Sequence, residues 1–175
     1  MIARGEAWRA RGIPKQPNEP ALAGDRGEEM SYTNLLYHIV YATKERAPLI
    51  TSPLRPRLHE YLGGTVRGLG GIPIEINGMS DHVHLLVRLR PTMSVSDFLN
   101  KLKSNSSGWA RRQTGGRFAW QSRYGAFTVS ESQVAHVRLY IRTQQKHHEK
   151  RSFEEEYKIL LKANRLDFDA AHLWS

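Results

Sequence analysis

Hydrophobic positions in the first half of the chain follow two different periods, which predict strands and helices. Residues 34–42 are rich in aromatic and β-branched side chains, as is typical of a buried strand. Residues 53–69 carry a leucine or valine at every fourth position and are followed by glycines, which predicts an amphipathic helix. Two alternating runs, 72–77 and 82–89, flank a short turn at 78–81 and predict a β-hairpin.

The second half of the chain predicts three more helices and one more strand. Residues 94–112 indicate a helix opened by a serine cap. Residues 118–129 form an irregular aromatic segment that ends in a short strand. A serine and a glutamine with the spacing of a capping box begin a helix at Ser130, which we expect to run to about residue 150. A last helix is predicted to begin at Ser152 and to end near Asn164.

The predicted order of elements is strand, helix, strand, strand, helix, strand. This order is the split βαβ arrangement of ferredoxin-like, or RRM-like, folds, so we expect an α+β βαββαβ sandwich with an antiparallel sheet and helices appended at the C-terminus. In that topology the first strand and the 82–89 strand are central neighbours. Residues 1–30 have no hydrophobic period and predict a disordered leader before a domain spanning 31–175. Met30 directly precedes this domain, so translation starting there would give a chain without the leader.

The charge of the chain changes this picture by indicating a partner. There are 26 Lys and Arg residues against 17 Asp and Glu residues, a formal net charge of +9 and a pI of about 10.0. Residues 1–30 contribute no net charge, whereas residues 101–151 hold eleven basic and two acidic side chains. A solvated basic surface would also explain this clustering, but the phosphates of a nucleic acid are the better explanation.

Two absences restrict the chemistry and the compartment. The chain has no cysteine, which excludes disulfides and thiolate metal sites. It has no apolar run of about 18 residues and no signal-peptide core, so neither a membrane span nor secretion is indicated. We therefore expect a soluble, intracellular protein.

His82 and His84 are the strongest chemical signal in the sequence. They lie one residue apart on a predicted strand, so both imidazoles leave the same face and can share a divalent cation, while Val83 points to the other face. Two hydrogen-bonded strand histidines without a metal would show the same spacing. A metal site therefore needs a third ligand from elsewhere in the chain.

The predicted helix from Ser130 offers such a ligand. Its apolar stripe is Val134, Val137 and Ile141, by which we expect it to dock on the domain. Polar side chains three or four residues apart run beside this stripe: Gln133, His136, Tyr140, Gln144 and His147. A docked helix would bring the phenol of Tyr140 and the amide of Gln144 to one ion. The alternative for Tyr140 is a core aromatic whose hydroxyl lies at the surface, and six other tyrosines are rival candidates.

Four motifs in order resemble one known family. Along the chain they are His-Ile-Val-Tyr-Ala-Thr-Lys at 38–44, Asp-His-Val-His-Leu-Leu-Val at 81–87, Trp-Gln-Ser-Arg-Tyr-Gly-Ala-Phe at 120–127 and Tyr-Ile-Arg-Thr-Gln at 140–144. Together they resemble the single-tyrosine HUH transposases, the TnpA-type enzymes of the smallest bacterial insertion sequences, with REP-associated tyrosine transposases as relatives. The resemblance extends from Ser31 to about Ser175 and includes the pair His147-His148.

The resemblance implies a homodimer that cuts and rejoins single-stranded DNA, binds hairpins near the ends of the mobile element, and often completes one subunit's site with the tyrosine helix of the other. It implies Tyr140 as the nucleophile that forms a 5′-phosphotyrosine, and His82, His84 and Gln144 as ligands of Mg²⁺ or Mn²⁺. Energy is retained in the phosphotyrosine bond, so no nucleotide cofactor is needed. His38, on the neighbouring strand, is either a partner of the metal ligands or an ordinary buried histidine.

Basic and aromatic side chains around the basic segment are candidates for DNA contact. We expect phosphate contacts from Arg88, Arg90, Lys101, Lys103, Arg111, Arg112, Arg117, Arg123 and Lys146. Trp120 and Tyr124 are candidates for stacking on unpaired bases, although Trp120 fits the protein core equally well.

Two other functions remain open from the sequence. The first is a catalytically inactive, domesticated nucleic-acid-binding module with a ferredoxin-like fold, which intact His82, His84, Tyr140 and Gln144 argue against. The second is a replication initiator or relaxase with the same HUH chemistry. Those enzymes commonly add a third histidine to the cluster and carry further domains, and we expect neither in this chain.

Overall fold

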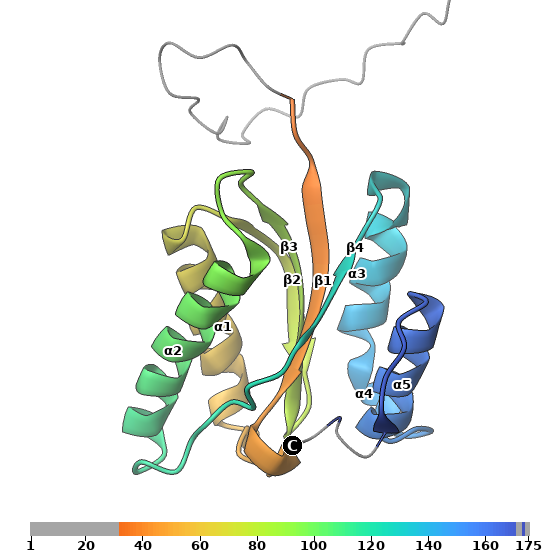
Figure 1. Ribbon diagram of the computed structural model, residues 1–175. Helices are drawn as coiled ribbons and strands as arrows, with labels where there is room; N and C mark the ends of the chain where they lie inside the picture. The colour runs from red at the N-terminus through yellow and green to blue at the C-terminus, as the bar shows by residue number, and fades with distance from the viewer. Residues whose placement is uncertain (1–31, 171–172, 174–175) are drawn as a thin grey trace, which may run out of the picture. The chain divides into compact units, whose positions relative to one another are not determined.

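The computed structural model describes residues 32–170 and residue 173. A four-stranded antiparallel sheet lies at the centre, with the strand order β2-β3-β1-β4 (Figure 1). The strands are β1 (Leu35–Ala42), β2 (Ile72–Gly78), β3 (His82–Leu89) and β4 (Gly125–Thr128). The helices are α1 (Leu54–Gly68), α2 (Val95–Gln113), α3 (Val134–Arg142), α4 (Gln144–His148) and α5 (Phe153–Ala163), with 3₁₀ turns η1 (Lys44–Arg46) and η2 (Glu131–Gln133).

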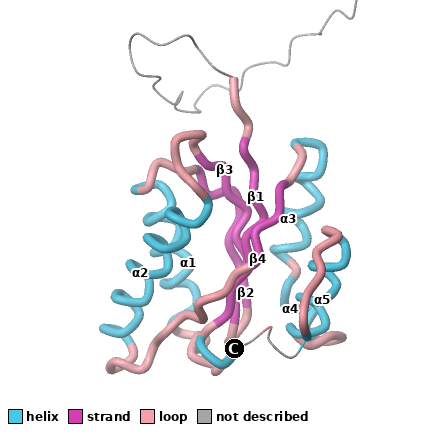
Figure 2. Tube along the Cα trace, viewed as in Figure 1, coloured by secondary structure: helices cyan, strands magenta, loops and turns pink. Residues whose placement is uncertain are grey.

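This strand order confirms the ferredoxin-like prediction, and β1 and β3 are central neighbours as expected. The sheet separates two helical layers: α1 and α2 cover one face, and α3, α4 and α5 cover the other (Figures 1 and 2). The leader predicted at 1–30 lies outside the described residues. In the part of the chain that is described, no helix is both long enough and apolar enough to cross a membrane.

The face toward α1 and α2 holds the larger hydrophobic core. Alternate residues of β1 and β3 point into it, where they meet the apolar stripes of α1 and α2. Among its fully buried side chains are Ile39, Tyr41, Leu58, Leu62, Val83, Leu85, Phe98 and Leu102. Trp120 belongs to this core: it is 8% exposed, and its indole N–H donates to the Ser106 hydroxyl at 2.9 Å. Buried in this way, Trp120 offers no surface on which a base can stack, which corrects the stacking prediction for this residue.

The opposite face combines a polar region with a smaller apolar cluster. Val40, Ala42 and Phe127 on the sheet pack against the α5 side chains Phe153 and Tyr157. Because His38, His82 and His84 lie on the same face of β1 and β3, the docked α5 brings its polar groups close to these histidines. The apolar cluster thus positions α5 beside the histidine pair.

The helix predicted from Ser130 to about residue 150 differs from the prediction at both its start and its middle. Ser130 makes no capping hydrogen bond, and the chain turns through η2 before α3 begins. At Thr143 the helix is interrupted, because the amide nitrogen of Asn77 donates to the carbonyls of Ile141 and Arg142 at 2.9 and 3.1 Å. Those carbonyls are then not used to continue α3 without a break.

The apolar stripe of α3 docks on the sheet as predicted. Ile141 is buried, and Val134 and Val137 are half-buried. Of the polar residues beside the stripe, Gln144 is buried and Tyr140 is half-buried. The other three, Gln133, His136 and His147, are exposed.

The capping box predicted at Ser152 is present and fixes the start of α5. The Ser152 hydroxyl accepts from the backbone N–H of Glu155 at 3.3 Å, and the Glu155 carboxylate accepts from the backbone N–H of Ser152 at 2.9 Å. From this start, Phe153, Glu156 and Tyr157 share the buried face of the helix. The cap therefore sets which glutamate of the first turns points inward.

Replacing this cap should destabilise the protein, whereas replacing the other predicted cap should not. We expect Ser152→Ala to lower the free energy of unfolding by about 1 kcal/mol, because one N-terminal amide of α5 loses its acceptor. Ser130→Ala is the matched control, since among the described residues the Ser130 hydroxyl has a hydrogen bond only with the Ser132 hydroxyl, at 3.0 Å, and a change below about 0.5 kcal/mol is expected. Urea unfolding followed by circular dichroism measures both; equal losses would contradict the assignment.

Candidate active site

The two histidines of β3 lie fully buried on the face of the sheet toward α3, α4 and α5. The Nδ1 atom of His82 is 2.7 Å from Oδ1 of Asp81, the residue directly before it. The imidazole of His82 also stacks on the ring of Phe153, with ring centroids 3.9 Å apart. Its position is thus fixed by a carboxylate on one edge and by α5 on one ring face.

His84 is held from the neighbouring strand. Its Nδ1 atom is 3.0 Å from Nε2 of His38, which is buried on β1, and the two rings stack at 5.2 Å. Burial, together with the nearby His84, lowers the pKa of His38 to about 3, so this ring is neutral. His38 is therefore a direct hydrogen-bonding partner of one of the predicted metal ligands.

These contacts determine which nitrogen of each ring is free. Asp81 accepts a hydrogen bond from Nδ1–H of His82, which places the lone pair of that ring on Nε2. When Nδ1–H of His84 donates to His38, its lone pair is likewise on Nε2. Among the described residues, neither Nε2 atom has a hydrogen-bond partner, and both are buried. Two buried, unpartnered imidazole nitrogens on one face fit a bound divalent cation.

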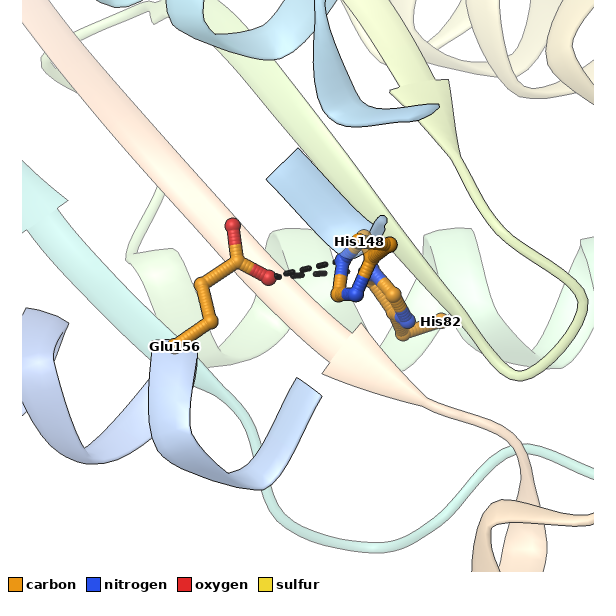
Figure 3. Close-up of side chains that lie close together, drawn as sticks. All are labelled: His82, His148 and Glu156. Carbon is orange, nitrogen blue, oxygen red and sulfur yellow. Dashed lines mark ion pairs between the residues drawn. The ribbon is translucent and has the colours of Figure 1, made fainter. Parts of the chain in front are cut away.

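A carboxylate that was not predicted lies opposite these nitrogens. Oε2 of Glu156, on α5, is 4.0 Å from Nε2 of His82 and 3.7 Å from Nε2 of His84. It is also 3.0 Å from Nε2 of His148, on α4 (Figure 3). Candidate ligand atoms of His82, His148 and Glu156 all lie within 4.8 Å of one another. Three imidazoles thus surround a single carboxylate oxygen.

The other oxygen of Glu156 contacts the predicted nucleophile. Oε1 accepts a short hydrogen bond from the Tyr140 hydroxyl and another, 2.9 Å long, from the Gln144 amide nitrogen. The ring of Tyr140 lies 6.0 Å from both His38 and His84. The structure therefore brings Tyr140 and Gln144 to the histidine pair within one chain, through a glutamate that connects them.

The protonation states at the site follow from this arrangement. Burial opposes ionisation of Glu156, but the neighbouring imidazoles of His148 and His84 and the Tyr140 hydroxyl outweigh it and hold the carboxyl pKa far below its ordinary value. Burial and the negative charge of Glu156 raise the pKa of the Tyr140 phenol. As arranged here, Tyr140 keeps its proton, and a positive charge near Glu156 would favour the phenolate.

The residues predicted to contact DNA lie outside this cluster. Most of them are exposed: Arg90, Lys101, Arg111, Arg112, Arg117, Arg123, Tyr124 and Lys146. Arg88 and Lys103 are half-buried. The ammonium of Lys103 donates to the backbone carbonyls of Gln121 and Ser122, the latter at 2.9 Å, so it ties α2 to the segment before β4. Lys103 is therefore engaged within the fold, while the exposed side chains remain predicted DNA contacts.

Glu156 and His148 were not predicted to lie at this site, where the imidazole of His148 is 4.7 Å from that of His82 between ring centroids. A signal for Glu156 is present in the sequence. Phe153, Glu156 and Tyr157 are spaced three and four residues apart, so a capped helix starting at Ser152 places a carboxylate on its apolar face. A carboxylate on an apolar face requires a partner. His148 has no comparable signal, since adjacent histidines at a helix end are ordinarily exposed.

The His38–His84 contact should strengthen metal binding. We expect His38→Phe to weaken Mn²⁺ binding by about 10- to 100-fold, because Nδ1 of His84 loses its partner and the ring its preferred tautomer. His38→Gln keeps a polar group within reach of that atom and should lose less. Isothermal titration of Mn²⁺ into each protein without DNA measures the affinities, with thermal unfolding as the check on folding. Wild-type affinity in the folded His38→Phe variant would contradict this role.

Comparisons with known proteins find related sequences and similar folds. Residues 31–144 match the family model described as "Transposase IS200 like". The ISDra2 transposase TnpA of Deinococcus radiodurans is 28% identical over 117 residues, which cover 63% of this chain and 84% of that protein. A crystal structure of a candidate transposase from the same organism superposes with a TM-score of 0.53 at 28% identity, covering 69% of this chain and 98% of the other.

The structure of a REP-associated tyrosine transposase bound to a REP hairpin has the same fold, with a TM-score of 0.52 at 15% identity, covering 71% of this chain and 74% of the other. The family model covers well over half of the sequence and includes both β3 histidines, Tyr140 and Gln144. The resemblance found in the sequence motifs is thereby confirmed. The chain belongs to the family of IS200-like transposases, enzymes of DNA transposition.

Proposed function

We propose that this transposase cuts and rejoins single-stranded DNA through a 5′-phosphotyrosine on Tyr140, with a divalent cation held at His82 and His84. One observation carries the proposal: the Tyr140 hydroxyl and the two unpartnered Nε2 atoms converge on the carboxylate of Glu156. A nucleophile, a hydrogen-bond acceptor that orients it and two nitrogens suited to bind a metal then share one cluster.

In the first step the phenolic oxygen of Tyr140 attacks phosphorus of a DNA phosphodiester. A bond forms between that oxygen and phosphorus, and the bond from phosphorus to the 3′-oxygen breaks. The phenol releases its proton to solvent, and the departing 3′-oxygen takes up a proton to become a 3′-hydroxyl. Oε1 of Glu156 accepts the hydrogen bond of the Tyr140 hydroxyl and so orients the phenolic oxygen, whereas its lowered pKa makes this carboxylate a poor proton acceptor. A bound divalent cation would polarise a phosphoryl oxygen and balance the added negative charge.

The second step reverses the first with another strand. A 3′-hydroxyl attacks the phosphotyrosine, restores a phosphodiester and returns the proton to Tyr140. The number of phosphoester bonds does not change, so the reaction needs no nucleotide cofactor. His82 and His84 would hold the cation. The family motifs imply that Gln144 adds an amide oxygen as a third ligand. In the structure both polar atoms of Gln144 are engaged, with Glu156 at 2.9 Å and with His148 at 3.1 Å.

The expected substrate is single-stranded DNA next to a hairpin. The excess of basic residues and the exposed arginines of α2 and the segment after it, Arg111, Arg112, Arg117 and Arg123, support a DNA partner. The hairpin in the structure of the REP-associated transposase supports a hairpin as the recognised shape. A homodimer, as implied by the family motifs, is part of this proposal.

Loss of the phenol should abolish covalent attachment to DNA. Labelled single strands from the flanks of the protein's own locus, incubated with Mn²⁺ or Mg²⁺, should give a protein–DNA adduct on denaturing gels. We expect Tyr140→Phe, or EDTA, to reduce the adduct by about three orders of magnitude or more, because the nucleophile or the Lewis acid is missing. Tyr32→Phe, which removes the hydroxyl of an exposed tyrosine (91% exposed) that is not a predicted DNA contact, is the control and should react like wild type.

Two outcomes would count against the proposal. An adduct that persists in Tyr140→Phe would assign the nucleophile to another residue. DNA binding by the wild type without any adduct, whichever metal is supplied, would favour the catalytically inactive DNA-binding module.

The position of Tyr140 also predicts how subunits cooperate. Because its hydroxyl contacts Glu156 of the same chain, we expect the tyrosine to act on the histidine pair of its own subunit. A mixture of Tyr140→Phe and His82→Ala proteins should then remain inactive in the adduct assay, as each subunit lacks one half of its site. Recovered cleavage in the mixture would show that the tyrosine serves the partner subunit instead.

A further inference from the structure

We propose that His148 and Glu156 complete the cation site of this chain, so that three imidazoles and one carboxylate are the ligands and Gln144 positions them. Both residues lie beyond residues 31–144, the region that matches the family model. The inference rests on the proposed function for the role of the cation in catalysis. Its evidence and its test, however, concern metal binding alone.

Three equivalent nitrogen atoms converge on one carboxylate oxygen. Nε2 of His148, His84 and His82 lie 3.0, 3.7 and 4.0 Å from the same oxygen, Oε2 of Glu156. In a six-coordinate site with ligands at about 2.1 Å, neighbouring ligand atoms are roughly 3 Å apart and opposite ones roughly 4 Å. The observed spacings span this range. The side chains come from three elements, β3, α4 and α5, and meet at one point (Figure 3).

All three imidazole rings have a partner at Nδ1. Nδ1 of His82 faces Oδ1 of Asp81 at 2.7 Å. Nδ1 of His148 faces the backbone carbonyl of Arg151 at 3.2 Å. His84 follows the same pattern with His38. Anchoring Nδ1 and leaving Nε2 toward the centre is the arrangement that outer partners impose on metal-bound histidines.

The carboxylate of Glu156 is buried beside these nitrogens. Its side chain is 7% exposed, and Oε2 forms an ion pair with His148 at 3.0 Å when that imidazole is protonated. His82 and His84 each leave a buried Nε2 atom without a hydrogen-bond partner among the described residues. Unpartnered buried nitrogens are unfavourable unless a cation joins them to the carboxylate. One divalent cation at this position would provide a partner for all of these atoms.

Gln144 has a different position from the ligand that was expected. Its amide nitrogen donates to Oε1 of Glu156 at 2.9 Å, and its amide oxygen lies 3.1 Å from Nε2 of His148. Gln144 therefore touches both of the added ligands and orients them. This donor set also bears on the choice of metal: three imidazoles favour Mn²⁺ over Mg²⁺, which prefers oxygen ligands.

The test measures Mn²⁺ binding to the purified full chain without DNA, from the loss of the free Mn²⁺ EPR signal. We expect Glu156→Gln and His148→Gln each to weaken binding by about tenfold or more, and the wild type to bind Mg²⁺ about tenfold more weakly than Mn²⁺. Glu154→Gln is the matched control, because it removes a charge from the same helix but from a side chain that pairs with Lys158 at 2.6 Å. Its Mn²⁺ affinity should equal that of the wild type.

Pulsed EPR of the bound Mn²⁺ adds a readout that a purely structural role would not change. The ¹⁴N couplings from imidazole should decrease in His148→Gln. Unchanged couplings together with wild-type affinity in both variants would overturn the proposal, as would a loss of binding in Gln144→Ala but not in Glu156→Gln. If Glu156→Gln does not fold, His148→Gln decides the result, since that ring is partly exposed (11%). Because no DNA is present, failure here is distinct from failure of the adduct assay.

Discussion

The buried negative charge of Glu156 is the interaction on which the candidate site depends. A carboxylate on the inner face of a helix loses most of its hydration, which is unfavourable unless nearby groups replace the lost water. Here groups from several elements replace the water. They are the imidazoles of the β3 histidines and of His148 on α4, the hydroxyl of Tyr140 on α3 and the amide of Gln144 on α4. One charge therefore constrains the relative positions of α3, α4, α5 and β3.

The fold supplies this charge with partners through the pairing of β1 and β3. In that register Val40 lies opposite His84 and Ala42 opposite His82, so small or medium apolar side chains flank the pair on the site face. His38, which lies on β1 with Val40 and Ala42, contacts His84 of β3 diagonally across the strand pair. The α5 side chains Phe153 and Tyr157 pack on the apolar sheet residues Val40, Ala42 and Phe127. This packing brings α5 close enough for Glu156 to face the imidazoles. Apolar packing thus determines where the polar contacts form.

The parts of this site that the sequence could predict are those set by local periodicity. Alternation along a strand was enough to place His82 and His84 on one face, and helical spacing was enough to place Tyr140 and Gln144 together. The bounds of β1, β3 and α1 likewise agree with the predicted segments to within a residue. These predictions depend only on residues that lie close together in the sequence.

The remaining features depend on contacts between residues far apart in the sequence. Asn77 interrupts the predicted long helix at Thr143 from a strand more than sixty positions earlier, and no pattern within the helix reveals it. The start of α5 was predictable from its capping box, but the surface on which its inner face docks was not. For the same reason the imidazole of His148, at the end of a short helix, could not be assigned to the cluster before the helices were placed.

The position of Glu156 would also couple Tyr140, the proposed nucleophile, to a bound cation. Its Oε1 atom holds the proton of Tyr140, and its charge raises the pKa of that phenol, while its Oε2 atom faces the imidazole nitrogens. A cation beside Oε2 would withdraw electron density from the carboxylate and lower the pKa of the phenol at the same time. Without the cation, the same carboxylate keeps the phenol protonated and therefore weakly nucleophilic. A single side chain that contacts both partners would thus allow attack on a phosphodiester only when the metal is bound.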